Sequence, residues 1–274
     1  MISCKSLCKR YDNVPVLKNI TFTVKEGERV SLIGPGSSGK TTILKILLGL
    51  EEKDKGDSQL FGHNLQLLSN MQRNAIFRKM GVAFQQGGLF DFMTVKENLA
   101  FAMRNMTKEV GSKMDEKIQI LLDAVKLSRT SHMFIYELSG GMKKRVGIAR
   151  ALCNEPEIAI FDEPTSGLDP VTSTIILNMI LDLSVKLHTT MLIATSNVEI
   201  AIRFAKRIVV VHEGRVLADG PWRDLLVDGS QLVKEFLGVR LIGLDVEYMQ
   251  ELGLPESFVA SYQTGHKGSA ITNN

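Results

Sequence analysis

The chain has 274 residues, of which 44% are hydrophobic and 23% are charged, a composition typical of globular proteins. At a prior of roughly 150 residues per domain, it holds one large domain or two modest ones. The net charge of +3 is too small to indicate a nucleic-acid ligand, because such proteins usually carry a strong basic stripe. Three cysteines and no recognisable signal peptide favour a reducing, cytosolic compartment. The apolar runs are far shorter than the roughly 18 residues that cross a bilayer, so a membrane role would require another chain as anchor.

The first part of the chain predicts strands, a glycine-rich turn and a helix. Residues 2–11 and 14–23 are expected to form short strands, and Val30–Ile33 is a compact apolar run that ends at Gly34. After the turn, Thr41–Leu50 places its apolar residues at helical spacing. Strand, glycine-rich turn and helix in this order are typical of one arm of a parallel α/β sheet.

The middle of the chain, from about residue 90 to residue 153, is helical in pattern. A capping box, Thr94-x-x-Glu97, opens the first predicted helix, and a glycine pair precedes the last. The predicted helices are Val95–Arg104, Lys113–Val125 and Met142–Cys153.

Strand signals then return, so the sheet continues after the helical stretch. The predicted strands are Ile158–Phe161, Thr190–Ala194 and Arg207–His212. Asp169-Pro170 opens a helix between the first two, since Asp is a good N-cap and Pro suits the first helical position. The sequence therefore predicts an α/β core interrupted by a helical insertion.

The glycine-rich turn fits the phosphate-binding pattern G-x4-G-K-[ST] and lies between a predicted strand and a predicted helix. From average residue frequencies, the pattern arises by chance in about one per cent of chains of this length, so an ordinary turn is the poorer interpretation. Backbone N–H groups at the helix start bind phosphate oxygens, Lys40 offsets the β- and γ-phosphate charge, and the Thr41 hydroxyl reaches Mg²⁺. The predicted nucleotide-binding residues of this loop are Gly34, Pro35, Gly36, Ser37, Ser38, Gly39, Lys40, Thr41 and Thr42.

Two adjacent acids, Asp162 and Glu163, end an apolar strand. Such a strand places them at the carboxyl edge of the sheet, where α/β folds bind ligands. A solvated strand end is the alternative, but acids are disfavoured in strands and a Mg²⁺-nucleotide needs a nearby carboxylate. We assign Asp162 to the metal and Glu163 to the attacking water, which it orients or deprotonates.

A third feature lies at Ser139-Gly140-Gly141, directly before a predicted helix. A hydroxyl and two glycine N–H groups at a helix start can bind an anion.

Together these motifs resemble the nucleotide-binding subunit of ABC transporters over about residues 1–237. The resemblance implies that Tyr11 stacks on adenine, that Gln85 is the Q-loop glutamine of the metal site, and that Asp169 closes a D-loop for communication across a dimer. Ser139–Met142 is similar to the signature motif, which binds the ATP of a second subunit. The plainer alternatives are core packing for Tyr11, a strand-end amide for Gln85 and a helix N-cap for Asp169.

The same resemblance implies the fold. We expect an α/β P-loop NTPase of ABC type, with a mixed, mainly parallel sheet core formed by residues 1–87 and 156–237. A helical subdomain is inserted at 88–155, and a short antiparallel β part lies near the N-terminus. Residues 238–274 would be a C-terminal extension, docked to about residue 263 because it stays apolar to there, and disordered beyond it.

A narrower resemblance lies in Val82–Phe101 and in the signature that ends in Met142. Both are similar to the ATPase subunits of Mce-associated (Mla-type) transporters, which move phospholipids between bacterial membranes. This implies ATP and Mg²⁺ as cofactors and, as partners, a second copy bound head to tail, integral-membrane permease subunits and Mce-domain substrate-binding subunits, with no nucleic acid. The chain would then lie on the cytoplasmic face of the inner membrane, held there by the permease.

Other functions share these motifs. ATPases of lipoprotein release or solute import are alternatives, because the distinguishing segment is short. A soluble ATPase of DNA repair or the ribosome is a rival, but such relatives usually carry tandem cassettes or long coiled-coil insertions. Within the predicted helical subdomain, Leu89, Phe90, Phe92 and Met93 are candidates for permease contact, against packing in the subdomain's own core.

Two residues depart from the family pattern. Ser37 stands where the phosphate loop usually has Gly, which predicts an uncommon backbone conformation that Gly36 could absorb. Ser196 stands where the family has its switch histidine, so the predicted catalytic set is Glu163, Lys40 and Ser196. A short neutral hydroxyl replaces imidazole poorly, which leaves slow hydrolysis, or an ATP-binding clamp, as an alternative. Ser196-x-x-Glu199 is also a capping-box pattern for the next helix.

Overall fold

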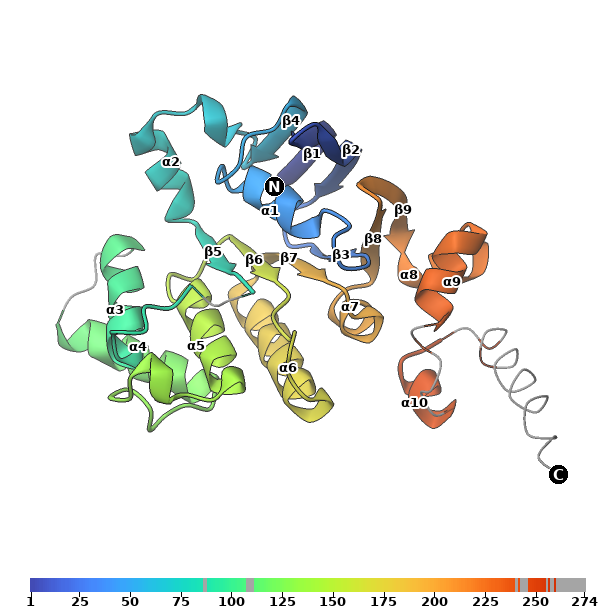
Figure 1. The fold of residues 1–274 in the computed structure, drawn as a ribbon. Helices are drawn as coiled ribbons and strands as arrows, with labels where there is room; N and C mark the ends of the chain where they lie inside the picture. The colour runs from blue at the N-terminus through green and yellow to red at the C-terminus, as the bar shows by residue number, and fades with distance from the viewer. Residues whose placement is uncertain are drawn as a thin grey trace.

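The computed structural model describes residues 1–85, 88–106, 111–239, 241, 246–254, 256 and 259. Its centre is a six-stranded sheet in the order β5-β6-β7-β3-β8-β9, in which only β9 is antiparallel to its neighbour (Figure 1). The strands are β3 (Arg29–Ile33), β5 (Met80–Ala83), β6 (Ile158–Asp162), β7 (Thr190–Thr195), β8 (Arg207–His212) and β9 (Arg215–Pro221). The three strands predicted after the helical stretch are all present.

A smaller antiparallel sheet, ordered β2-β1-β4, covers one side of the core. It consists of β1 (Ile2–Tyr11), β2 (Val14–Val24) and β4 (Lys55–Leu60). Asp12 and Asn13 connect β1 to β2 with φ angles of 45° and 66°, the backbone that a tight hairpin with right-handed strand twist requires. This sheet is the predicted antiparallel β part.

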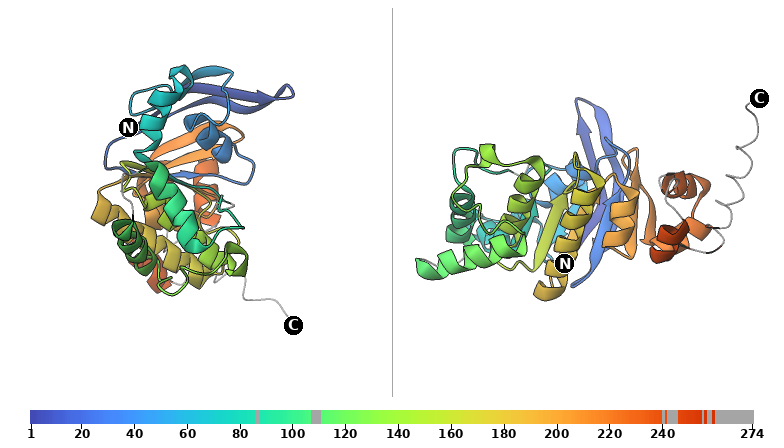
Figure 2. Two further views of the ribbon diagram at one scale, coloured as in Figure 1. Left: turned by 90° about the vertical axis from the view of Figure 1, so that its left-hand side faces the viewer. Right: turned by 90° about the horizontal axis from the view of Figure 1, so that it is seen from below.

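The central sheet is buried on both faces. In β6, Ile158 and Ile160 face the core shared with the antiparallel sheet and α1 (Lys40–Leu47), whereas Ala159 and Phe161 face the core formed with the helices on the other side. The two views of Figure 2 show the same layering. Residues that follow β3 and β6 therefore emerge together at the carboxyl edge of the sheet.

The second face is covered by helices, including those of the predicted insertion. They are α3 (Val95–Met106), α4 (Ser112–Ala124), the 3₁₀ turn η2 (Ile135–Glu137), α5 (Gly140–Leu152), α6 (Pro170–Leu187) and α7 (Val198–Phe204). The predicted capping box is confirmed, since Glu97 N–H donates to Thr94 Oγ1 and Thr94 N–H donates to Glu97 Oε2. The remaining elements near β4 and β5 are η1 (Leu65–Leu67) and α2 (Asn70–Phe77).

The start of α5 differs from the prediction. The helix begins at Gly140 and not at Met142, because the Ser139 side chain is its N-cap and accepts a hydrogen bond from the Met142 N–H. The two glycines lie inside the first turn instead of preceding it.

Helix α6 is, by length and composition, long and apolar enough to cross a membrane, although the sequence shows no uninterrupted apolar run of that length. About 39% of it is buried, and Ile176, Leu177 and Ile180 are fully buried in the core beneath the sheet. One face of this helix therefore packs in the core.

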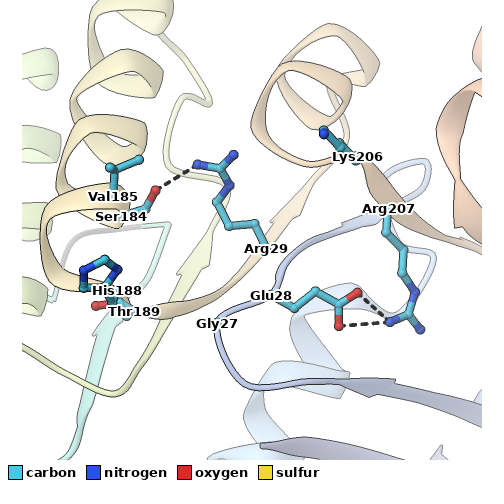
Figure 3. A pocket seen from close by; sticks show the side chains of 9 residues that line it. All are labelled: Gly27, Glu28, Arg29, Ser184, Val185, His188, Thr189, Lys206 and Arg207. Atoms are coloured by element: carbon cyan, nitrogen blue, oxygen red, sulfur yellow. Dashed lines mark hydrogen bonds and ion pairs between the residues drawn. The ribbon is translucent and has the colours of Figure 1, made fainter.

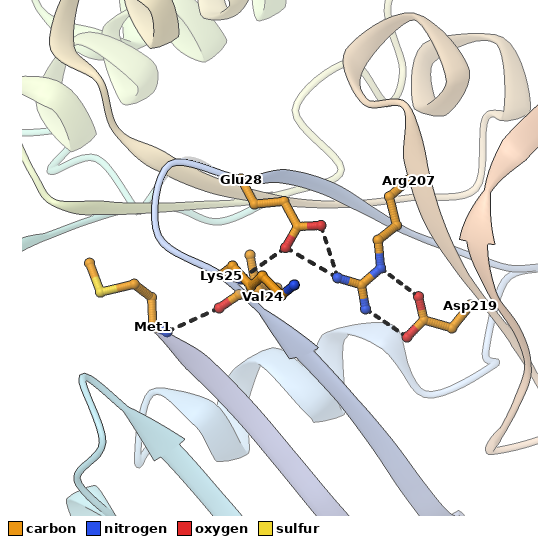
Figure 4. Close-up of polar contacts among 6 residues, drawn as sticks. All are labelled: Met1, Val24, Lys25, Glu28, Arg207 and Asp219. Atoms are coloured by element: carbon orange, nitrogen blue, oxygen red, sulfur yellow. Dashed lines mark hydrogen bonds and ion pairs between the residues drawn. The ribbon is translucent and has the colours of Figure 1, made fainter.

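The amino edge of the sheet is held by charged contacts. Arg207 lies between Glu28 and Asp219, with a two-bond fork to the Asp219 carboxylate at 2.7 and 2.8 Å (Figure 4). Arg29, at the start of β3, donates to Ser184 Oγ near the end of α6 across a pocket of about 480 Å³ (Figure 3). These contacts fasten β3, β8, β9 and α6 together at the edge opposite the phosphate loop.

After β9, the described residues include the short helices α8 (Trp222–Asp228), α9 (Gln231–Val239) and α10 (Val246–Glu251). Met249 and Leu254 are buried in a core with Val198 and Ile202 of α7. The described part of the extension is thus docked on this chain. The predicted docking as far as residue 263 and disorder after it fall largely outside the described residues, and the domain boundaries stay predictions.

Candidate nucleotide site

The phosphate loop is shaped by two glycines that have no room for a side chain. A Cβ on Gly34 would lie 2.0 Å from the Val211 carbonyl oxygen, so the loop backbone leaves β3 pressed against β8. Gly39 has a φ of 105°, and a Cβ there would lie 2.6 Å from Leu17 Cδ2. Both positions demand glycine, as the sequence pattern predicts.

Ser37 adopts the left-handed conformation itself, with a φ of 62°. The prediction of an uncommon backbone at this position is confirmed. The idea that Gly36 absorbs the departure is wrong, because Gly36 is not among the residues with positive φ. A non-glycine residue in this region costs about 1 kcal/mol or more, so the loop is strained at Ser37.

Lys40 is buried, and its ammonium points back into the loop. Nζ donates to the carbonyl oxygens of Gly34 (2.8 Å) and Pro35 (2.9 Å) and to Ser38 Oγ. Burial lowers the pKa of Lys40, and the nearby charges of Glu163 and Asp162 oppose that shift. A buried ammonium beside backbone N–H groups at a helix start provides the charge and donors that a triphosphate binds.

Thr41 and Asp162 meet across the sheet edge. Thr41 Oγ1 donates to Asp162 Oδ2 at 3.0 Å and lies 3.3 Å from Oδ1. Burial raises the pKa of Asp162, and the hydrogen bond from Thr41 partly offsets this rise. One hydroxyl and one carboxylate fit Mg²⁺, which usually takes one or two protein oxygens together with substrate phosphates. No cluster of three His, Cys, Asp or Glu side chains that could hold a metal alone occurs in the described ranges.

Gln85, the third predicted metal residue, follows β5 at the same edge but is exposed. Its backbone carbonyl accepts a hydrogen bond from Lys144 Nζ. The structure therefore brings Thr41 and Asp162 together, and the role of Gln85 in metal binding stays a prediction.

Glu163 lies in a tight turn after β6, with a left-handed φ of 46°. Its N–H donates to the Ala194 carbonyl of β7 at 2.8 Å, and its Oε2 accepts from Thr195 Oγ1 at 3.3 Å. Thr195 is fully buried at the end of β7. Thr195 was not predicted as a site residue, and its only signal in the sequence was its position next to Ser196 at the switch position.

The switch turn is built differently from the prediction. The N-cap of α7 is Asn197, whose Oδ1 accepts from the Ile200 N–H at 3.1 Å, so the proposed Ser196 cap is wrong. Asn197 caps the helix in place of Ser196 because it directly precedes the first helical residue, which is the N-cap position. Ser196 is exposed, and within the described part of the chain its side chain makes no hydrogen bond.

The signature residues lie away from the phosphate loop of the same chain. Ser139 and Gly140 are exposed at the start of α5, which covers the opposite face of the sheet from α1 (Figure 1). A Cβ on Gly141 would approach Thr172 Cγ2 of α6 to 2.9 Å. Asp169 caps α6 by accepting from the Thr172 N–H at 2.9 Å. Binding of ATP by Ser139–Gly141 of a second copy stays a prediction.

Tyr11 ends β1 with 39% of its surface exposed, and the Lys9 ammonium lies 4.9 Å from its ring centroid. An exposed aromatic ring is free to stack on a base. Core packing, the plainer alternative, does not suit this exposure.

Comparison with known proteins identifies the family. A family model described as ABC transporter matches residues 17–166. The chain belongs to the ABC transporter family. It is 34% identical over 242 residues to a probable ribonucleotide transport ATP-binding protein of Mycobacterium leprae, covering 88% of this chain and 70% of the relative. It is also 33% identical to a methionine import ATP-binding protein of Mesorhizobium japonicum (92% and 68% covered).

Among solved structures, a dimeric ATP-binding cassette in a post-hydrolysis state with ADP and Pi matches with a TM-score of 0.75 and 30% identity, over 81% of this chain and 98% of that one. The ATP-binding subunit of another ABC transporter matches with a TM-score of 0.72 and 28% identity, over 92% and 99%. The predicted fold class is confirmed, and the chain is an ABC ATPase that couples ATP hydrolysis to transport. The individual roles of its site residues stay predictions.

Proposed function

We propose that this ABC ATPase drives phospholipid movement in a bacterial Mce/Mla-type transporter, from the cytoplasmic face of the inner membrane. The observation that supports this most is the segment 82–101 together with the signature ending in Met142. A plant relative, 31% identical and from Arabidopsis thaliana, is named for the galactolipid trigalactosyldiacylglycerol. Other relatives are named for ribonucleotide, methionine and glutamate/aspartate transport, so their names favour no single substrate.

In the proposed reaction, each residue has a distinct task. Lys40 and the loop N–H groups hold the phosphates, and Thr41 and Asp162 hold Mg²⁺, which when bound offsets phosphate charge. Glu163 accepts a proton from the attacking water, aimed by its bonds to β7. Ser139–Gly141 of a second copy complete the site, so that ATP closes a head-to-tail dimer and product release opens it.

The proposed permease contact lies at the aromatic residues before and within α3. Phe92 is 73% exposed and Phe101 is 44% exposed, and the Phe90 ring lies between them, with centroids 5.8 and 5.0 Å away. Leu89, by contrast, packs on the subdomain core. Of the predicted permease residues, Phe92 is the one best placed to enter a groove of another protein.

The test is purification with membrane proteins in mild detergent, followed by reconstitution of the complex in liposomes that carry a fluorescent phospholipid. We expect ATP-dependent movement of the phospholipid, lost in Phe92→Ser while the ATP affinity of the isolated chain is unchanged. Leu67→Ser, which changes another largely exposed apolar residue, in η1, is the matched control. Stimulation by methionine or ribonucleotides in place of lipid would contradict the proposal.

A slow ATP-binding clamp is the second candidate, supported by the exposed Ser196 at the switch position. Loss of one preorganised donor to a transition state typically costs about 10²–10³ in rate. We expect Ser196→His to raise turnover without changing ATP affinity. A wild-type rate in the ordinary range of about 1–100 s⁻¹, not raised by histidine, would exclude the clamp.

A further inference from the structure

Lys144, in the first turn of α5, makes contacts that the family motifs do not explain. Its side chain leaves the signature helix and reaches the carboxyl edge of the sheet in the same chain. The ammonium donates to three oxygens: the carbonyl of Gln85, the carbonyl of Glu163 at 3.2 Å, and Ser166 Oγ at 3.5 Å. An ammonium has three protons, so these acceptors use its full donor capacity.

All three acceptors are uncharged, as are the three acceptors of the buried Lys40 ammonium. Among the described residues, no carboxylate lies within ion-pair distance of Lys144, although the charges of Glu163 and Asp162 act on it from farther away. Burial lowers the pKa of Lys144. A solvated surface lysine would instead leave its charged end in water.

The three oxygens belong to two segments with separate tasks. Gln85 follows β5 at the base of the helical subdomain, whereas Glu163 and Ser166 belong to the turn after β6. Ser166 Oγ also donates to the Glu163 carbonyl at 3.0 Å, so this carbonyl is held from two sides. This carbonyl belongs to Glu163, whose left-handed backbone conformation sets the direction of the proposed catalytic carboxylate.

We propose that Lys144 is a positioning residue that ties the Gln85 segment to the Glu163 turn and so holds the Glu163 carboxylate in its productive orientation. The inference rests on the proposed role of Glu163 in hydrolysis. A displacement of Gln85 breaks one of the three bonds and loosens the Glu163 turn, which links the position of the helical subdomain to the chemistry. A misplacement of about 1 Å can cost about 10²-fold in rate.

The test is the ATPase activity of the purified chain, measured with Lys144→Met. We expect kcat to fall about 10- to 100-fold while KM and the ATP dissociation constant stay within about twofold. Lys144→Arg, which keeps the charge and several donors, should recover most of kcat. Lys143→Met removes a charge from the same helix turn without touching these oxygens, and is the matched control.

Single-turnover experiments with protein in excess over ATP make the ratios of the variant rates to the wild-type rate measurable even if wild-type turnover is slow. Hydrogen exchange should quicken in residues 163–168 of Lys144→Met and not of Lys143→Met. If Lys144→Met does not fold, Ser166→Ala removes one acceptor and should lower kcat severalfold with KM unchanged.

The proposal would be overturned if kcat is unchanged in Lys144→Met or Ser166→Ala, or if the Lys143→Met control loses as much kcat as Lys144→Met. It would also be overturned if Lys144→Arg does not recover kcat, or if KM rises in parallel with the loss of kcat. These outcomes are separate from the phospholipid proposal, because the assay needs neither permease nor lipid. If Glu163→Gln hydrolyses ATP as fast as wild type, the premise about Glu163 fails, whatever Lys144 does.

Discussion

Lys40 donates to carbonyl oxygens of its own loop, so the charge that would meet a triphosphate is already buried at the helix start. Lys40→Ala should weaken ATP binding sharply and abolish turnover, because the phosphates lose their principal cation. Isothermal titration with ATP measures this. Lys45→Ala, an exposed lysine on the same helix, is the control. Undiminished affinity in Lys40→Ala would remove the assignment of the loop.

Glu163 is held by hydrogen bonds from its N–H to β7 and from Thr195 to its carboxylate. Glu163→Gln keeps the shape but removes the proton acceptor, so ATP should bind normally while hydrolysis falls by at least about 10²-fold. Radiolabelled ATP binding and phosphate release from one preparation separate the two steps. Wild-type phosphate release would show that another group activates the water.

The switch turn offers a test of stability at two adjacent residues. Asn197→Ala should lower the free energy of unfolding by about 1 kcal/mol, because α7 loses its cap. Ser196→Ala should change it by less than about 0.5 kcal/mol, the usual range for surface positions. Urea denaturation of both variants decides. The reverse order would restore Ser196 as the cap.

For individual residues, the sequence predicts the contacts that are determined by short local motifs. The spacing around Lys40 and the acids after a buried strand were enough to bring Thr41 and Asp162 together. The contacts of Thr195 and Lys144 were not predicted, because they depend on which strand lies beside β6 and on where α5 lies relative to the sheet edge. Neither is readable from spacing along one chain.

Helix α10 is fastened to α7 by a polar contact that can be tested directly. Tyr248 donates its hydroxyl proton to Glu199 Oε1 at 2.6 Å and accepts from Arg203 Nη1 at 3.1 Å. Tyr248→Phe should cost about 1–2 kcal/mol in unfolding free energy and quicken hydrogen exchange in residues 246–254. Gln250→Ala, at an exposed position of α10, is the control. Unchanged exchange would show that apolar burial alone holds α10.

The same contact carries a pH dependence. Burial, reinforced by the hydrogen bond to Glu199, raises the pKa of Tyr248. The folded chain therefore holds this proton more tightly than the unfolded chain does, so the contribution is present below about pH 10 and is lost as the pH rises through the raised value. The stability difference between wild type and Tyr248→Phe should shrink over that range.

Elements with strong periodic patterns were predicted within a few residues, and weakly patterned ones were not. β4 has the sequence Lys-Gly-Asp-Ser-Gln-Leu and becomes a strand through its pairing with β1. β9 contains Gly and Pro and has no fully buried residue, because it is an edge strand. Such segments owe their conformation to neighbours distant in sequence.

For the whole molecule, the head-to-tail arrangement can be tested by complementation. Lys40→Ala and Ser139→Phe should each be inactive alone, since every composite site then lacks one part. A mixed dimer restores one site, built from the intact Lys40 of one chain and the intact Ser139 of the other, so mixing should recover measurable ATPase activity. Mixing Lys40→Ala with Glu163→Gln should recover none, because both changes fall on the same half of each site. Equal activities in the two mixtures would contradict the arrangement.

The alternation of buried faces along the strands was sufficient to predict the layers of the fold, and the order of the motifs was sufficient to predict the family. The ion pairs of Arg207 with Glu28 and Asp219 at the amino edge were not predicted. These residues follow no local sequence pattern, and they meet only because β3, β8 and β9 lie side by side in the sheet.

Helix α6 joins the two ends of this architecture. Asp169 caps it at the catalytic edge, and Ser184 is bound by Arg29 at the amino edge. The 15 residue steps from Asp169 to Ser184 (184 − 169) span about 22 Å at about 1.5 Å per residue. If the whole helix turned about the Ser184 contact, its Asp169 end would move farthest. Each degree of such a rotation would displace Asp169 by about 0.4 Å and five degrees by about 2 Å, and Thr172, whose N–H Asp169 accepts, would move with it.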